Sequence, residues 1–130
     1  MKPTVALGFR SEKDIYYLEE FAKLGCRLLV ATEDGSVGTK GNVMDAIKEN
    51  NLKADLIFSC GPMPMLRAIK AYGVSEHIDA YISLEERMAC GVGACLGCVV
   101  KTKEVDHHSH VNNARICTDG PVYLAGEVEI

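Results

Sequence analysis

The amino-acid sequence predicts an α/β fold in which a parallel sheet with helices on both faces precedes a small C-terminal β lobe. Up to residue 84, short apolar segments alternate with segments of helical periodicity. The strand-like segments are apolar almost throughout, as expected for parallel strands that are covered on both faces. The alternation then stops, and Gly and Cys crowd residues 90–98. We therefore expect an α/β domain over residues 1–86 and a separate lobe over residues 87–130.

The first elements follow from local composition. Residues 4–8 are apolar and end at a glycine, which predicts a short buried strand. Residues 12–24 carry apolar side chains at helical spacing after Ser11, which is a favourable N-cap residue. Residues 27–31 predict the second strand, and the polar, glycine-rich residues 32–41 predict a loop.

The same alternation continues through the middle of the chain. Residues 42–51 predict a second helix, and residues 55–59 predict a third strand. Residues 64–72 predict a third helix, with Pro64 in its first turn, where a missing N–H costs nothing. Residues 79–84 predict a fourth strand. In the lobe, Val99–Lys101 and Pro121–Val128 have strand-like composition.

Ligands of open parallel sheets bind beyond the carboxyl ends of the strands. The residues there that suit a dinucleotide are Gly8, Arg10, Glu33, Asp34, Cys60, Gly61 and Pro62. A carboxylate after the second strand can bind the adenosine ribose and repel a 2′-phosphate, which favours NAD over NADP. Arg10 could meet the pyrophosphate, and Gly61 could admit a planar ring. The full G-x-G-x-x-G fingerprint is absent, so ordinary turns at Gly8 and Asp34 and a buried thiol at Cys60 stay open as alternatives.

Four cysteines form the most specific pattern: Cys90, Cys95, Cys98 and Cys117. Their C-x4-C-x2-C…C spacing is typical of plant-type [2Fe–2S] centres. A tight loop would supply three thiolates and a returning strand the fourth. Between them, Gly91, Gly93 and Gly97 allow positive φ, close approach of the backbone and N–H bonds to sulfur.

Other uses of these cysteines remain open. A structural zinc also takes four thiolates, although usually from two closely spaced pairs, and Cys117 has no close companion in sequence. Disulfides are typical of small secreted domains, whereas this chain has a good core pattern. His107, His108 and His110 lie in a polar segment without the cysteine spacing of a Rieske centre, so a solvated loop is expected.

Composition narrows the class of protein. The chain has 130 residues, 48% of them apolar, and a formal net charge of −4. Without a basic stripe a nucleic-acid partner is not expected, and no apolar run has the length of a membrane span. The chain begins with Met1–Thr4 and enters an apolar strand without a signal-peptide pattern, so we expect a cytoplasmic protein.

Several segments resemble the electron-transfer subunit of B-type dihydroorotate dehydrogenase, in the ferredoxin–NADP reductase superfamily. These segments are residues 33–41, 60–63, 83–98 and 117–122, and the run over residues 83–98 is the most specific. The resemblance covers nearly the whole chain, but it corresponds only to roughly the C-terminal half of the family's members. It implies that the four cysteines bind the cluster and that the residues at the strand ends bind NAD(H).

The same resemblance implies partners. The family passes electrons between NAD and an FMN-containing catalytic subunit, which oxidises dihydroorotate to orotate in pyrimidine biosynthesis. The family's FAD-binding barrel and its Arg-x-Tyr-Ser/Thr motif are missing from this sequence. FAD is therefore expected mainly on a domain or chain outside it. The rival hypothesis is a non-enzymatic interaction module, an α/β domain stapled by zinc.

Overall fold

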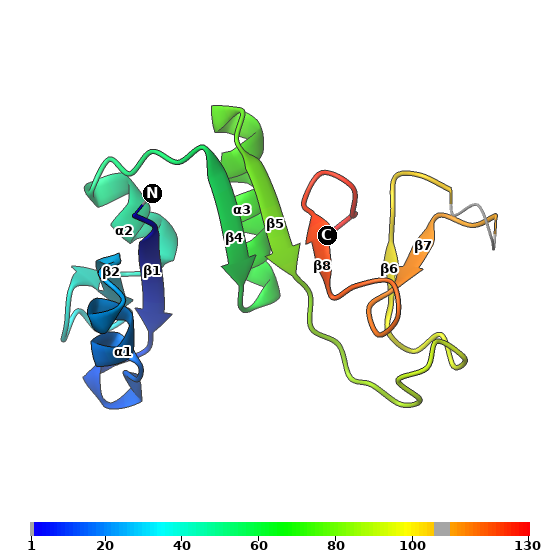
Figure 1. Cartoon of the computed structure of the whole chain (residues 1–130), viewed down its shortest axis with the longest axis horizontal. Coiled ribbons are helices and arrows are strands. Elements are labelled where there is room, and N and C mark those ends of the chain that lie inside the picture. The colour runs from blue at the N-terminus through cyan, green and yellow to red at the C-terminus, as the bar shows by residue number, and fades with distance from the viewer. Residues whose placement is uncertain (1, 106–109) are drawn as a thin grey trace. The chain divides into compact units, whose positions relative to one another are not determined.

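The computed structural model describes residues 2–105 and 110–130 (Figure 1). The chain divides into two compact units, Met1–Lys53 and Ala54–Ile130. Each unit contains two parallel strands that are joined through a helix, which confirms the predicted α/β class. None of the helices in the described residues is both long and apolar enough to cross a membrane.

The first unit is a parallel sheet with its connecting helices. Its elements are β1 (Thr4–Phe9), the 3-10 turn η1 (Glu12–Asp14), α1 (Leu18–Lys23), β2 (Arg27–Thr32), β3 (Thr39–Lys40) and α2 (Val43–Glu49). The strands lie in the order β1-β2-β3, and Gly8 of β1 pairs with Ala31 of β2. Ala31 is fully buried, and Val43 and Ala46 of the helix α2 are buried as well, because α2 packs against β1, β2 and β3.

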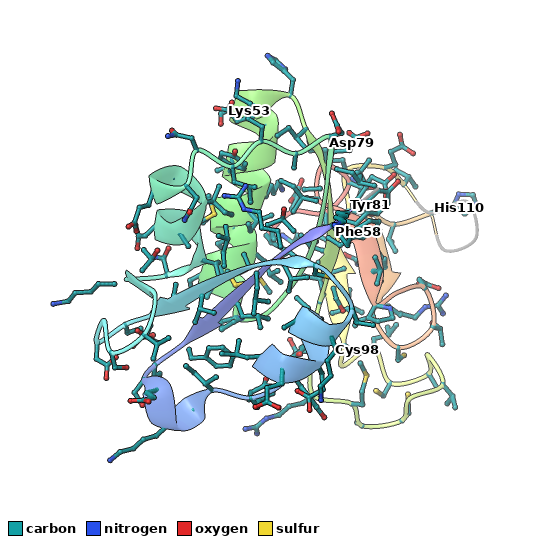
Figure 2. The ribbon with its side chains drawn as sticks, turned by 60° about the vertical axis from the view of Figure 1, so that its left-hand side comes forward. Lys53, Phe58, Asp79, Tyr81, Cys98 and His110 are labelled. Carbon is teal, nitrogen blue, oxygen red and sulfur yellow. The ribbon has the colours of Figure 1, made fainter. Side chains whose placement is uncertain are left out.

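The second unit contains the remaining strands. Its elements are β4 (Leu56–Cys60), α3 (Met63–Glu76), β5 (Asp79–Ser83), β6 (Val99–Lys101), β7 (Asn113–Arg115) and β8 (Val122–Leu124). The strands β4, β5 and β8 form one sheet, in which β8 is antiparallel to β5 (Figure 1). Phe58 and Tyr81 stack on neighbouring strands of this sheet, with ring centroids 5.6 Å apart (Figure 2). A separate antiparallel pair joins β6 and β7.

The core of the second unit lies between α3 and its sheet. Leu66 and Ile69 of the helix are buried, and Ile82 of β5 is completely inaccessible. The predicted boundary after residue 86 falls inside this unit, because β8 returns to pair with β5. A division of function at that boundary stays a prediction.

One predicted helix is wrong as a continuous element. Residues 12–24 split into η1 and α1, because Ile15 is extended (ψ 133°) and Tyr17 has a left-handed backbone (φ 60°). Neither conformation fits an α-helix. The Tyr16 ring packs edge-on against Phe9 and Tyr17, at centroid distances of 5.4 and 5.3 Å. These ring contacts favour the break over a helix that runs on from Glu12.

Smaller differences concern short strands. The sequence did not predict β3 or β7, and the expected strand over residues 121–128 is confined to Val122–Leu124. Of the histidines expected in a solvated loop, His107 and His108 lie outside the described residues. His110 is described and exposed, with a left-handed backbone (φ 55°).

Candidate metal centre and nucleotide site

The first sulfur pair lies on the irregular segment between β5 and β6. The N–H groups of Val92 and Cys95 both donate to Cys90 Sγ, each at 3.4 Å. These bonds, the one from Cys95 first, lower the pKa of the Cys90 thiol to about 6, and the Cys95 side chain adds a further hydrogen bond. The N–H of Gly97 donates to Cys95 Sγ at 3.4 Å. The segment is thus folded so that its amides surround two neighbouring sulfurs.

The second sulfur pair lies where β6 and β7 meet. Cys98 directly precedes β6 and is 4% exposed, and Cys117 follows β7 by two residues. Their backbones are held together because the N–H of Ile116 donates to the Cys98 carbonyl oxygen at 2.9 Å. A hydrogen bond between the side chains of Cys98 and Cys117 raises the pKa of Cys117, and burial adds to the increase. Cys98 therefore sits against the sulfur that is most distant in sequence.

Gly93 connects the two pairs. Its N–H bonds to the Cys117 sulfur, although Gly93 belongs to the loop between Cys90 and Cys95. Its backbone is left-handed (φ 78°), and an added Cβ would lie 3.2 Å from the Thr118 side chain. The glycine thus permits the close approach of the loop to the turn that carries Cys117.

The backbone prediction for the three loop glycines is only partly right. Gly91 has the expected positive φ of 67°, as does Gly93. Gly97 is not among the residues with positive φ, and Leu96 takes that conformation instead (φ 57°). A Cβ on Gly97 would still lie 3.4 Å from Cys95 Sγ, so the close approach of backbone to sulfur is present. The left-handed residue of this turn is therefore Leu96, one position before the glycine that was predicted to take this conformation.

The four sulfurs do not converge on one point. Among the described residues, no group of three or more His, Cys, Asp or Glu side chains is placed to hold a single metal ion. The contacts instead define two pairs, Cys90 with Cys95 and Cys98 with Cys117. Mononuclear zinc needs all its ligands around one tetrahedral centre. Paired thiolates suit a group that contains two metal ions.

A compact turn supports Cys117. The Asp119 carboxylate accepts bonds from the backbone N–H of Arg115 at 2.8 Å and from its Nε at 3.1 Å. These bonds, the backbone one first, lower the pKa of Asp119. The Tyr123 hydroxyl donates to the Arg115 carbonyl oxygen at 3.2 Å. Asp119 and Tyr123 thus both hold Arg115, two residues before Cys117, in place.

We expect Asp119→Ala to weaken metal retention without unfolding the chain. The change frees the turn that carries Cys117, and loss of such supporting contacts typically lowers metal affinity by roughly tenfold or more. The measurement is the rate at which a chelator removes metal from the loaded chain. Asp55→Ala is the control, because Asp55 is an exposed carboxylate of the same unit and lies far in sequence from the four candidate ligands, which begin at Cys90. Equal rates for both variants would contradict a supporting role for Asp119.

The predicted nucleotide residues of the first unit lie together at the carboxyl ends of β1 and β2. The N–H of Glu33 donates to the Phe9 carbonyl oxygen at 3.1 Å, and that of Asp34 to the Arg10 carbonyl oxygen at 3.2 Å. Gly8 faces α2 so closely that an added Cβ would lie 2.9 Å from the Val43 side chain. The two strand ends are therefore joined by backbone bonds beside the start of a helix.

The loop after β2 is folded back onto its own strand. The buried Thr32 hydroxyl donates to the Val37 carbonyl oxygen at 2.7 Å and accepts the Val37 N–H at 3.1 Å. Gly41 also donates its N–H to the Thr32 carbonyl oxygen, at 2.9 Å. Gly38 is left-handed (φ 67°), and its hypothetical Cβ would lie only 2.1 Å from the Val30 carbonyl oxygen. The loop is thus held in one conformation.

The other predicted nucleotide residues lie in the second unit, after β4. Gly61 has a positive φ of 155°, and a Cβ there would lie 2.7 Å from the Met65 methyl group. Pro62 precedes the first residue of α3. The exposed Cys60 thiol lies 3.8 Å from Glu85 Oε1, to which it donates. The prediction had not included Glu85 among the site residues. Cys60 pairs with Ser83 across β4 and β5, and Glu85 follows Ser83 by two residues. The pairing of these parallel strands is therefore the signal that could have identified Glu85 as a neighbour of Cys60.

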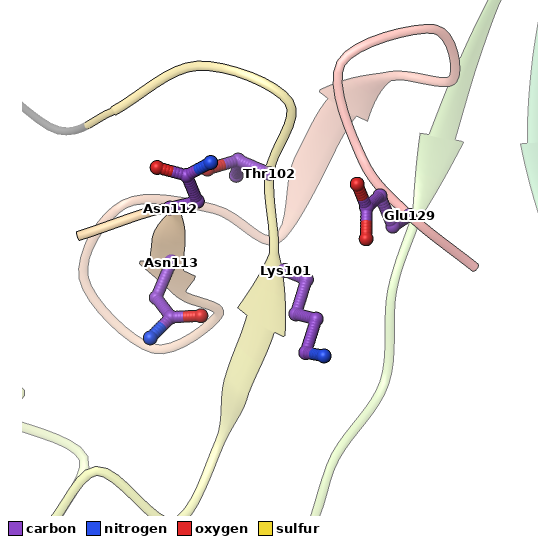
Figure 3. Close-up of a pocket in the computed structure, with 5 residues that line it drawn as sticks. All are labelled: Lys101, Thr102, Asn112, Asn113 and Glu129. Atoms are coloured by element: carbon purple, nitrogen blue, oxygen red, sulfur yellow. The ribbon is translucent and has the colours of Figure 1, made fainter.

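A separate polar pocket of about 280 Å³ lies in the second unit (Figure 3). Its lining residues are Lys101, Thr102, Asn112, Asn113 and Glu129. It contains none of the cysteines or predicted nucleotide residues.

Known proteins resemble this chain in sequence. Residues 85–129 match the iron–sulfur cluster binding domain of dihydroorotate dehydrogenase B. The electron transfer subunit of dihydroorotate dehydrogenase B (NAD(+)) from Fusobacterium nucleatum is 52% identical, over 100% of this chain and 48% of that protein. The corresponding subunit from Bacillus velezensis is 47% identical, over 95% of this chain and 46% of that protein. The chain thus spans about half the length of the curated relatives it matches.

The fold also resembles a solved structure. A structure of NADH-dependent reduced ferredoxin–NADP oxidoreductase, described for flavin-based electron bifurcation, matches with a TM-score of 0.80 and 28% identity. The match covers 98% of this chain and 44% of that one. In sequence and in fold, the chain therefore resembles the C-terminal half of the electron transfer subunit of B-type dihydroorotate dehydrogenase, within the ferredoxin–NADP reductase superfamily.

Proposed function

We propose that this chain is the electron-transferring part of an oxidoreductase that connects NAD(H), a flavin and a [2Fe–2S] cluster. The observation that carries the proposal is the gathering of the four cysteines: the Cys95 N–H donates to Cys90 Sγ, and the Ile116 N–H, next to Cys117, donates to the Cys98 carbonyl oxygen. Gly93, between Cys90 and Cys95, lies close to Thr118, which follows Cys117. The match of residues 85–129 to an iron–sulfur cluster binding domain and the similarity of the whole chain to electron transfer subunits support it.

The donor set fits the proposed cluster better than it fits zinc. Each iron of a [2Fe–2S] cluster takes two protein thiolates. Cys90 and Cys95 would hold one iron, and Cys98 and Cys117 would hold the other. The N–H groups that already point at the sulfurs would stabilise the added electron and raise the reduction potential.

Two further cofactors belong to the proposal. NADH gives up two electrons together as a hydride, whereas a [2Fe–2S] cluster exchanges one at a time, so a flavin between them is required. We place NAD(H) at the ends of β1 and β2 in the first unit, and the residues after β4 in the second unit stay a separate prediction. We place FAD mainly on a domain or chain outside this sequence, since the curated relatives are about twice as long as this chain.

The partner is proposed to be the FMN-containing catalytic subunit of dihydroorotate dehydrogenase, which acts in pyrimidine biosynthesis in the cytoplasm. Large apolar side chains are exposed beside the first sulfur pair: Met88 at 48%, Val92 at 72% and Leu96 at 64%. Exposed apolar patches of this kind are typical of interaction sites. A partner that covers this loop would come close to Cys90 and Cys95, as electron transfer requires.

Metal analysis tests the proposal. Chain purified without oxygen is expected to be red-brown and to contain about two iron and two acid-labile sulfide per chain. Its visible absorption should bleach when dithionite is added. One zinc per chain with no iron would instead support the zinc-stapled interaction module. Colourless protein after anaerobic reconstitution would contradict the electron-transfer function.

A further inference from the structure

The side chain of Arg115 lies beside the two segments that carry the candidate ligands. Arg115 is the last residue of β7, two residues before Cys117. An added Cβ on Gly93 would lie 3.5 Å from Arg115 Cδ and 3.2 Å from the Thr118 side chain. The N–H of Gly93 bonds to the Cys117 sulfur. The alkyl part of Arg115 therefore packs beside the loop that contacts this sulfur.

The Asp119 carboxylate uses both of its oxygens on Arg115. Oδ2 accepts the backbone N–H at 2.8 Å and the Nε–H at 3.1 Å, and Oδ1 accepts a bond from Nη2 at 3.4 Å. The shortest of these bonds comes from the backbone, so any residue except proline could supply it at position 115. The guanidinium therefore adds a positive charge that the turn itself does not require.

The negative charge of Asp119 lies close to the second sulfur pair. Burial raises the pKa of the Tyr123 hydroxyl to about 12, and the charges of Asp119, Cys98 and Cys117 add to the increase. The carboxylate and both sulfurs thus act on the same hydroxyl. A [2Fe–2S] cluster held by four thiolates has a net negative charge that grows when it accepts an electron. A carboxylate at this place would therefore oppose reduction.

Resting on the proposed [2Fe–2S] cluster, we infer that the Arg115–Asp119 ion pair sets the reduction potential of the cluster. Asp119 holds the turn that carries Cys117, but its charge disfavours the added electron. The Arg115 guanidinium offsets that charge from the same turn. Ion pairs at the surface contribute little to stability, so an electrostatic role explains the guanidinium better than a structural one. The two halves of the pair thus act on the cluster with opposite sign.

Two variants each remove one half of the pair. In Asp119→Asn the amide oxygen can keep the two shorter bonds to Arg115, but the negative charge is lost, so the reduction potential should rise. In Arg115→Met an unbranched side chain still covers Gly93, but the positive charge is lost, so the potential should fall. For each variant we expect about a tenfold change in the reduction equilibrium, which is about 59 mV for a one-electron couple.

The measurement is a spectroscopic redox titration of the full, cluster-loaded chain, with iron and sulfide content as the check on cluster retention. Arg115→Lys keeps the positive charge and should restore most of the potential that Arg115→Met loses. The double variant of Arg115→Met with Asp119→Asn removes both charges, so its potential should lie close to that of the unmodified chain. Asp79→Asn is the control for loss of one negative charge. Asp79 is exposed and begins β5, at the opposite end of that strand from the segment that leads to the cysteines (Figure 2).

The outcomes separate this inference from the proposal on which it rests. If the unmodified chain binds no iron, the proposed cluster is wrong, and the role of the ion pair is wrong with it. If the cluster is present but both single variants shift the potential in the same direction, or by no more than Asp79→Asn does, the cluster stands and the inference is overturned. Should Arg115→Met fail to retain iron, a raised potential in Asp119→Asn supports the inference and an unchanged or lowered one overturns it. Loss of iron in both variants would show that the pair is structural, which also overturns it.

Discussion

Replacing Cys95 with serine is expected to abolish the visible absorption of the cluster while NADH affinity stays nearly unchanged. Serine is a far weaker ligand than a thiolate, so one iron would lose half of its protein ligands. Cys95 is exposed, so its replacement removes little packing. The measurements are iron and sulfide content, the visible spectrum and an NADH titration on the same preparation.

Cys60→Ser provides the matched control for this experiment. Cys60 is also an exposed thiol in the second unit, but it contacts Glu85 rather than another cysteine. The control should therefore keep iron and sulfide at the level of the unmodified chain. Equal loss of cluster and NADH binding in Cys95→Ser would show that the two sites are not separable. Full retention of iron would remove Cys95 from the proposed ligands.

The largest effect on stability is expected from Gly38→Ala. The new Cβ would have to occupy space 2.1 Å from the Val30 carbonyl oxygen, which belongs to the middle of β2 and cannot rotate away. Either the strand or the loop must shift, and the left-handed backbone (φ 67°) adds its own cost for a side chain. We expect the free energy of unfolding to fall by roughly 3 kcal/mol.

Gly25→Ala separates the two contributions. Gly25 has nearly the same backbone conformation (φ 72°), but no atom lies within 4 Å of its hypothetical Cβ. It should therefore cost only the left-handed conformation, about 1 kcal/mol. Urea denaturation of both variants measures the difference. Equal costs would mean that the loop after β2 can move away from Val30, and that it is less firmly held than its hydrogen bonds indicate.

Sequence reasoning succeeded where a signal extends over several residues. Mostly apolar strands of five or six residues, such as β1 and β4, were located to within one residue at each end. Among the shortest strands it located the apolar β6 but missed β3 and β7. The strand β3 has only two residues, and β7 has the sequence Asn-Ala-Arg, so neither has a recognisable periodicity. Both exist because a neighbouring strand supplies their hydrogen bonds.

The candidate site shows the same limit. Cysteine spacing indicated which sulfurs belong together as a set, but not that Cys98 contacts Cys117 while Cys90 contacts Cys95. Glycine content indicated that the loop needs positive φ, but not that Leu96 would take it in place of Gly97. Pairwise contacts of this kind require the folded backbone.

The return of the C-terminal segment has a consequence for how the protein matures. Three of the sulfurs lie within residues 90–98, but Cys117 comes nineteen residues after Cys98. The strand β8, which follows Cys117, must also reach β5 before the second sheet is complete. During synthesis the ribosome still covers these residues when the first three cysteines emerge. Binding of the cluster by all four sulfurs must therefore wait until Cys117 has also emerged, well after the first three thiols are exposed.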